Sequence, residues 1–93
     1  MPITVEIPGP LRIHSNGSAL VTLDGHCDSV RQVLTELESQ CPGVVDRVLT
    51  EQGEVREHVN LFVDGENTRY TEGLDTPVRG SDTITILAAI SGG

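Results

Sequence analysis

The stretch "ITILAAISGG", residues 84–93, decides the fold, because it joins a predicted core strand to an ending that a folded core does not need. Ile84 and Ile86 lie two residues apart, so they point to the same face of a strand. Gly92 and Gly93 follow, and glycine loses more conformational freedom on ordering than any other residue. We therefore expect a core strand that presents a Gly-Gly ending at the surface of the domain.

Three other segments show the alternation of apolar and polar residues that is typical of strands. They are "ITVEI" at residues 3–7, "ALVTLDG" at residues 19–25 and "HVNLFVDGEN" at residues 58–67, the last of which turns at Asp64 and Gly65. The residues predicted to face the core are Ile3, Val5, Ile7, Ala19, Val21, Leu23, Val59, Leu61 and Val63.

The segment "DSVRQVLTELESQCPG", residues 28–43, has apolar residues at helical spacing and predicts an amphipathic helix. Ser29 and Gln32 are spaced for a capping box at its N-terminus, and Pro42 with the following glycine ends it. The sequence "VVDRVL" at residues 44–49 predicts a further short helical turn. The apolar stripe of the main helix consists of Val30, Val33, Leu34, Leu37 and Cys41.

This order of elements predicts an α+β fold in which a mixed sheet of four to five strands is covered by one main helix. The first and last strands should pair in parallel through the crossover, at the centre of the sheet. A short strand is expected at residues 68–70. We expect one domain at residues 1–87 and a flexible C-terminal tail at residues 88–93 that ends in Gly-Gly.

Size and charge restrict the classes of function. A chain of 93 residues forms one small domain with little room for an enzyme pocket of ordinary size. Its net charge of −8 repels nucleic acids and anionic membranes and favours a protein partner with a basic docking face. The sequence has neither an apolar run of membrane-spanning length nor a secretory signal, so we expect a cytoplasmic protein.

With these elements placed, the sequence resembles the β-grasp, ubiquitin-like proteins, and specifically the ThiS/MoaD family of sulfur carriers. The resemblance rests on "GSDTITILAAISGG" at residues 80–93, including the final Gly-Gly, and on "HVNLFVDGENTRYTEGLDTPV" at residues 58–78. Within the family the chain is most similar to the CysO type, which shares the long "VN…V…R" region and an alanine-containing tail. The resemblance implies a β-grasp fold.

The resemblance also implies a function. An E1-like enzyme would adenylate the Gly93 carboxylate with ATP, and sulfur transfer would convert it into a thiocarboxylate that donates sulfur, for the CysO type in cysteine biosynthesis. The chain would then be a co-substrate without catalysis or bound cofactor of its own. The implied partners are the activating enzyme, a sulfur-accepting enzyme such as a PLP-dependent cysteine synthase, and a JAMM-type metalloprotease.

Other functions remain open at this stage. The same sequence suits sulfur donation to thiosugar, molybdopterin, thiamine thiazole or thiosiderophore assembly. A ubiquitin-like modifier joined to target lysines through Gly93 is a second class, and a purely non-covalent interaction module is a third.

The predicted site follows the chain from the sheet to its end. Gly93 is the residue to be modified, and Gly92 provides clearance because it has no Cβ. Phe62 and Leu87 are apolar but out of phase with the core positions, so they should stand on the uncovered face and dock a partner. The tail residues predicted to contact the partner with them are Ala89, Ile90 and Ser91.

The two cysteines are interpreted as free thiols, as expected in a reducing compartment. Cys27 precedes a helix and neighbours His26, a setting in which a nucleophilic or persulfide role is conceivable, but an ordinary loop thiol is the favoured interpretation. Cys41 continues the apolar stripe of the helix and should be a small core residue.

The remaining polar candidates carry less chemistry. His14, His26 and His58 lack the spacing of metal ligands, so we expect no metal site. Most acidic residues should form a solvated surface. Asp64 and Asp82, with Glu66, are expected close enough to the tail to contact basic residues of a partner.

Overall fold

The structure is a computed structural model that describes residues 2–88. Its strands are β1 (Ile3–Glu6), β2 (Leu20–Leu23), β3 (Val59–Val63), β4 (Glu66–Asn67) and β5 (Thr83–Ala88). Its α-helices are α1 (Val30–Gln40) and α2 (Pro42–Val48), and its 3-10 helices are η1 (Gly9–Ser15), η2 (Thr68–Tyr70) and η3 (Gly73–Asp75).

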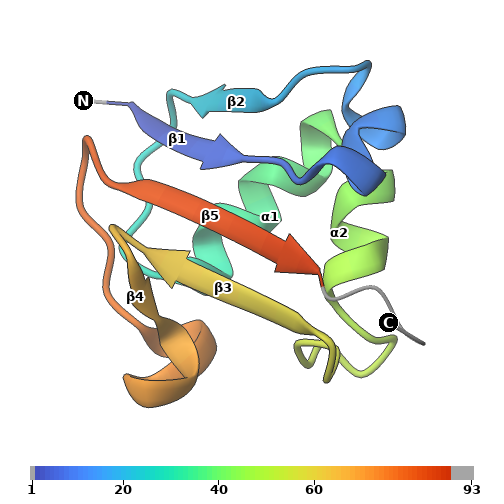
Figure 1. Ribbon diagram of the computed structural model, residues 1–93. Coiled ribbons are helices and arrows are strands. Elements are labelled where there is room, and N and C mark those ends of the chain that lie inside the picture. Colours follow the sequence, from blue (N-terminus) through green and yellow to red (C-terminus); the bar gives the residue numbers. More distant parts are fainter. Residues whose placement is uncertain (1, 89–93) are drawn as a thin grey trace.

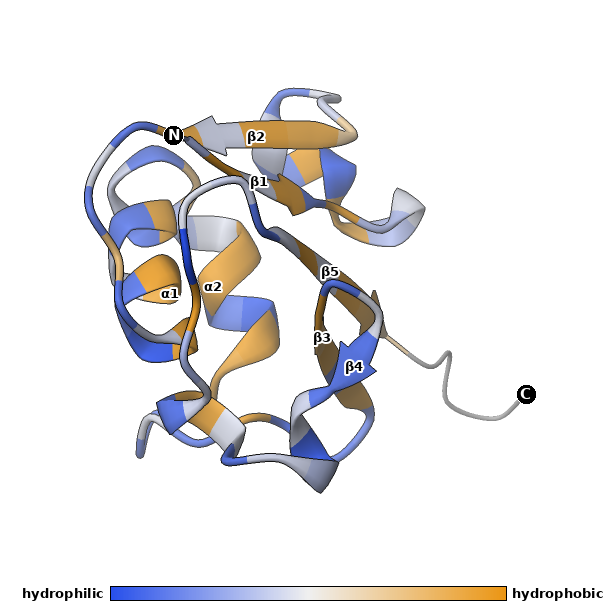
Figure 2. Ribbon diagram, turned by 90° about the vertical axis from the view of Figure 1, so that its left-hand side faces the viewer, coloured by the Kyte–Doolittle hydropathy of each residue, from blue (hydrophilic) through white to orange (hydrophobic). Residues whose placement is uncertain are grey.

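The five strands form one mixed sheet in the order β2-β1-β5-β3-β4 (Figure 1). β1 and β5 pair in parallel at the centre, with Val5 opposite Ile84, and the other neighbours are antiparallel. Both α-helices lie against the same face of the sheet (Figure 2). The predicted β-grasp architecture and the parallel pairing of the first and last strands are confirmed.

The core lies between the sheet and the helices. Nearly all strand residues predicted to face inward are buried or pack against the core, and Ile84 and Ile86 are 0% and 1% exposed. The prediction for Ala19 is wrong: its side chain is exposed, because it lies one residue outside β2, at the edge of the sheet. Each large core side chain contributes about 1.5–3 kcal/mol through removal of its apolar surface from water.

Helix α1 begins where the sequence predicts. The Ser29 hydroxyl accepts a hydrogen bond from the Gln32 amide, at 3.3 Å. The Gln32 side chain accepts from the amide of Asp28 rather than from that of Ser29, so the reciprocal bond is displaced by one residue. Pro42 follows the helix and also occupies the first turn of α2, where a missing N–H costs little.

Two short segments differ from the sequence prediction. Asp64 and Gly65 both have positive φ, 48° and 88°, a tight hairpin turn that lets pairing begin at once, with Val63 opposite Glu66. The short strand is therefore Glu66–Asn67, and the predicted strand at residues 68–70 is wrong. That segment is η2, whose first turn is capped by the preceding asparagine.

Candidate functional site

The uncovered face of the sheet carries the side chains that are out of phase with the core. Phe62 lies opposite Thr85, and Asn60 lies opposite Leu87, so these four residues share the face away from the helices. Leu87 is 49% exposed and Phe62 is half-buried. The structure thus places both predicted docking residues on the open face, while their role in docking stays a prediction.

The end of β5 directs the chain toward the predicted reactive residue. Ala88 is the last residue of β5 and lies opposite Val59, at the start of β3. The predicted site residues Ala89, Ile90, Ser91, Gly92 and Gly93 lie outside the described residues, as does most of the tail predicted at residues 88–93. The described part of the site is therefore the surface from which β5 leads to them.

A shallow hollow of about 190 Å³ borders this surface. It lies between the ends of β1 and β5, with Glu6, Arg12 and Leu87 among its lining residues. The Thr85 hydroxyl donates to the Glu6 carboxylate across the two strands, and Arg12 Nε donates to the carbonyl of Ile7 at 3.0 Å. Sequence reasoning did not find Arg12, because no element was predicted over η1, which supplies it.

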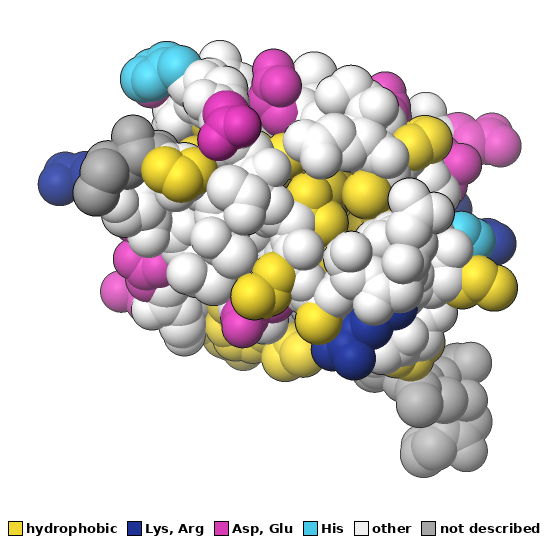
Figure 3. Space-filling model, turned by 90° about the horizontal axis from the view of Figure 1, so that it is seen from above, with side chains coloured by type: hydrophobic (Ala, Val, Ile, Leu, Met, Phe, Trp, Pro, Cys, Tyr) yellow, Lys and Arg dark blue, Asp and Glu magenta, His cyan; other side chains and the backbone are white. Residues whose placement is uncertain are grey.

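On the other side of Leu87, Arg69 holds the start of β3. Its Nε donates to Asn60 Oδ1 at 2.9 Å, and its Nη2 donates to the carbonyls of Glu57 at 2.8 Å and Val59 at 2.9 Å. Seen from above, hydrophobic side chains lie along the lower edge, which is the open-face side of the sheet, with an acidic and a dark-blue arginine group among them (Figure 3). The open face near the end of β5 is thus apolar with arginines beside it.

The acidic residues expected beside the tail lie elsewhere. Asp64 pairs with Thr83 through its side chain, at 2.7 Å, and through its amide, at 2.9 Å. Asp82 directly precedes β5, and Glu66 follows the same turn as Asp64. These carboxylates therefore lie at the beginning of β5, and Ala88 at its other end is about 17 Å away at the usual strand rise. The expectation that they lie near the tail is wrong.

The environment of Cys27 does not favour a thiolate. Its side chain is 3% exposed, and burial, followed by the negative charges of Glu36 and Asp28, raises the pKa of the thiol. His26 lies beside it but pairs with Asp28, at 2.6 Å between Nε2 and Oδ1. A high pKa and low exposure oppose nucleophilic chemistry, which supports the interpretation as an unreactive thiol. Cys41 is buried in the core, as predicted.

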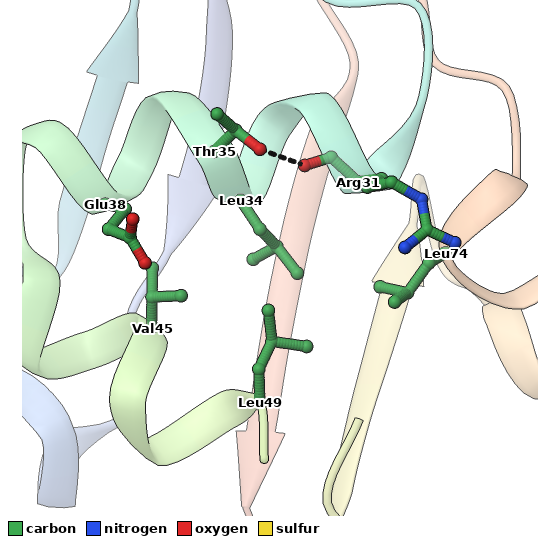
Figure 4. A pocket seen from close by; sticks show the side chains of 7 residues that line it. All are labelled: Arg31, Leu34, Thr35, Glu38, Val45, Leu49 and Leu74. Atoms are coloured by element: carbon green, nitrogen blue, oxygen red, sulfur yellow. Dashed lines mark hydrogen bonds between the residues drawn. The ribbon is translucent and has the colours of Figure 1, made fainter. Parts of the chain in front are cut away.

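A small cavity lies on the helical side of the molecule. A cavity of about 80 Å³ lies between α1 and α2, where the side chains of Leu34 and Leu49 point toward each other and Leu74 closes one side (Figure 4). This volume is far below the roughly 300–1,000 Å³ of ordinary ligand pockets. Across residues 2–88, no group of three or more His, Cys, Asp or Glu side chains is placed to hold a metal ion. No helix in this range is long and apolar enough to cross a membrane.

Comparisons with known proteins cover the whole chain. The family model of the ThiS family matches residues 5–93. The sulfur carrier protein CysO of Mycobacterium tuberculosis is 35% identical over 95 residues, which cover 100% of both chains. Small archaeal modifier protein 3 of Haloferax volcanii is 31% identical over 65 residues, 70% of each chain. A chain of the Amycolatopsis orientalis BexX/CysO complex superposes with a TM-score of 0.87 and 33% identity, over 98% of this chain and 99% of that chain.

Proposed function

Because the chain belongs to the ThiS family, we propose that it is a sulfur carrier protein whose Gly93 becomes a C-terminal thiocarboxylate. The observation that carries the proposal is the full-length similarity to a sulfur carrier, which continues through Gly92 and Gly93. A carrier of this family is a protein co-substrate of other enzymes and needs no catalytic site of its own. We place its work in the cytoplasm, where ATP is available for activation.

The proposed chemistry explains why another enzyme must act first. A carboxylate is a poor electrophile because its negative charge is spread over two oxygens. In the proposed reaction, a carboxylate oxygen of Gly93 attacks the α-phosphate of ATP and releases pyrophosphate. Sulfide, as HS−, then attacks the acyl carbon of the adenylate and expels AMP, and loss of the S–H proton leaves the thiocarboxylate. ATP belongs to the activating enzyme in this scheme.

The folded body supplies the energy with which the tail is ordered in a partner's site. Fixing one backbone residue of a flexible chain costs about 1–2 kcal/mol, so a tail that is flexible as the sequence predicts would cost roughly 5–10 kcal/mol for its five residues after Ala88. Docking of the open face beside Leu87 can offset this cost through burial of apolar surface. Gly92 and Gly93 have no Cβ and so pass through a narrow channel more easily than other residues.

The similarity to CysO favours cysteine biosynthesis as the pathway. The acceptor would then be a PLP-dependent cysteine synthase that holds an activated serine, and a JAMM-type metalloprotease would release the product. The relative found in the BexX/CysO complex indicates that carriers of this kind form complexes with a partner protein. Thiosugar, molybdopterin, thiamine thiazole and thiosiderophore assembly remain alternative destinations of the sulfur.

A second candidate function is protein modification through an isopeptide bond from Gly93 to target lysines. The similarity to small archaeal modifier protein 3 supports it. The chain has six arginines at positions 12, 31, 47, 56, 69 and 79 and no lysine, so it cannot carry further copies of itself on a lysine side chain. Such a modifier would therefore not form lysine-linked chains of itself.

Reconstitution tests the proposal directly. The purified chain is incubated with the E1-like enzyme of the same organism, ATP and a sulfide source, and its intact mass is measured. We expect a gain equal to the replacement of one oxygen by sulfur. A variant that lacks Gly92 and Gly93 is the control and should keep its mass. An unchanged mass of the full chain, under conditions in which a CysO protein reacts with its own enzyme, contradicts the proposal.

A further inference from the structure

We propose that the surface beside the end of β5 docks an acidic segment of the enzymes that receive the tail. The arginine-flanked patch, as we name it, consists of Arg12, Phe62, Arg69 and Leu87. The partner segment would place an apolar side chain against Leu87 and carboxylates against Arg12 and Arg69. This inference rests on the proposed function and specifies the chemistry of the partner's surface.

Arg12 is held in place on the β1 side of the patch. It lines the 190 Å³ hollow together with Leu87, and its Nε donates to the Ile7 carbonyl at 3.0 Å. The hollow is smaller than ordinary ligand pockets and has Pro8 and Leu87 among its lining residues, which suits a single side chain of a partner. The hydrogen bond to the backbone restrains the guanidinium before binding, so less side-chain entropy is lost on docking.

Arg69 is held on the β3 side. Its Nε donates to Asn60 Oδ1, and Asn60 lies directly opposite Leu87 in the sheet. Backbone carbonyls at the start of β3 accept from its Nη2. The two arginines therefore lie on opposite sides of Leu87, both oriented by the protein's own backbone or amide groups.

The positive charge of both arginines is available to a partner. Among residues 2–88, the contacts between acidic and basic side chains are His26–Asp28 and Arg31–Asp75, so no carboxylate in the described chain pairs with Arg12 or Arg69. Glu6 also lines the hollow, and the Thr85 hydroxyl donates to its carboxylate. Arg12, Arg69 and Glu6 together carry one net positive charge.

The charge of this surface is opposite to that of the chain as a whole. A net charge of −8 alone predicts a basic docking face on the partner. The terminal nitrogens of Arg12 and the Nη1 of Arg69 make no hydrogen bond among the described residues and can donate charge-assisted hydrogen bonds to carboxylates. Salt screens the field of the more distant carboxylates of the chain, so these direct contacts should dominate near the tail. The enzyme surface around the entrance for the tail should therefore carry Asp or Glu.

A charge-reversal pair tests the inference. Arg12→Glu is compared with Arg79→Glu, which changes the net charge equally but lies in the loop before β5, at the end away from Ala88. Pyrophosphate release by the E1-like enzyme of the same organism is measured at varied concentrations of each carrier variant. We expect Arg12→Glu to raise the KM for the carrier about tenfold or more at unchanged kcat, and Arg79→Glu to change it less than twofold.

The outcomes separate the inference from the proposed function. If the wild-type chain is activated but Arg12→Glu lowers the KM or changes it no more than Arg79→Glu does, the partner surface is not acidic and the inference fails alone. If the wild-type chain is not activated, the proposed function fails and the inference fails with it. If Arg12→Glu melts at a lower temperature than wild type, the same assay is run with Arg12→Gln instead. For Arg12→Gln we expect a smaller rise in KM at unchanged kcat.

Discussion

Substitution of Arg69 by alanine should destabilise the domain more than its exposed position suggests. The guanidinium donates to Asn60 Oδ1 and to the carbonyls of Glu57 and Val59, all within 2.9 Å. Hydrogen bonds to charged groups contribute about 1.5–3 kcal/mol each in favourable settings. Because one nitrogen serves more than one acceptor and the site is open to solvent, we expect a loss of about 2 kcal/mol in total. For a domain of this size, that loss lowers Tm by roughly 8–16 °C.

The measurement is urea denaturation of the wild type, Arg69→Ala and Arg79→Ala. Arg79 is also exposed, and within the described part of the chain its side chain makes no hydrogen bond, so its loss should change stability by less than about 0.5 kcal/mol. Hydrogen exchange should also quicken at residues 56–60 in Arg69→Ala, because the restraint on the start of β3 is lost. Equal stabilities of the two variants would refute the structural role assigned to Arg69.

Three further predictions concern single positions. Leu87→Glu should keep the fold but raise the KM of activation about five- to tenfold, because the exposed half of the leucine side chain no longer contributes apolar surface to docking. The control is Leu20→Glu, since Leu20 on β2 is 57% exposed and Leu87 is 49% exposed. Gly43→Ala should destabilise the domain by about 1–2 kcal/mol, although alanine favours helix more than glycine does, because the added Cβ would lie 2.6 Å from His14 Nδ1. In a double-mutant cycle of denaturation midpoints, His14→Ala should remove this cost. The pKa of Cys27 is raised in the folded state, so above about pH 9 the folded chain keeps a proton that the unfolded chain loses. The free energy of unfolding should therefore fall as the pH rises above about 9, and it should fall less in Cys27→Ala. Equal pH profiles of the two proteins in denaturation would contradict this.

Periodicity predicted the faces of the strands well because burial imposes it directly. Ile84 and Ile86 had to lie on one face, and Leu87 therefore on the other, whatever strands lay beside them. The parallel pairing with β1 followed from the order of the elements, since a crossover helix connects parallel strands.

The failures concern features that no local pattern encodes. Asp64 and Asp82 were predicted near the tail, but the register of Val63 with Ile84 places the turn at the opposite end of β5. Alternation indicates which face a residue occupies, and it carries no information about which end of a strand a distant loop meets.

The arginines were missed for a related reason. Arg12 belongs to a 3-10 helix for which the sequence predicted no element. Arg69 binds the carbonyls of Glu57 and Val59, which lie 12 and 10 residues earlier in the chain. Every residue has the same backbone carbonyl, so the sequence does not indicate which carbonyl a distant side chain will bind. Such contacts are decided by the tertiary structure.

The most direct test of the central claim uses the arginine pattern of the chain itself. Arg79 is the last arginine and the chain has no lysine, so trypsin releases residues 80–93 as one C-terminal peptide. After activation with ATP and sulfide, the fragment spectrum of this peptide locates the added sulfur. We predict sulfur in place of one oxygen on the fragment that contains Gly93 and on no fragment that ends before it. Sulfur at Cys27 or Cys41 instead, with an unmodified C-terminal peptide, would contradict the account.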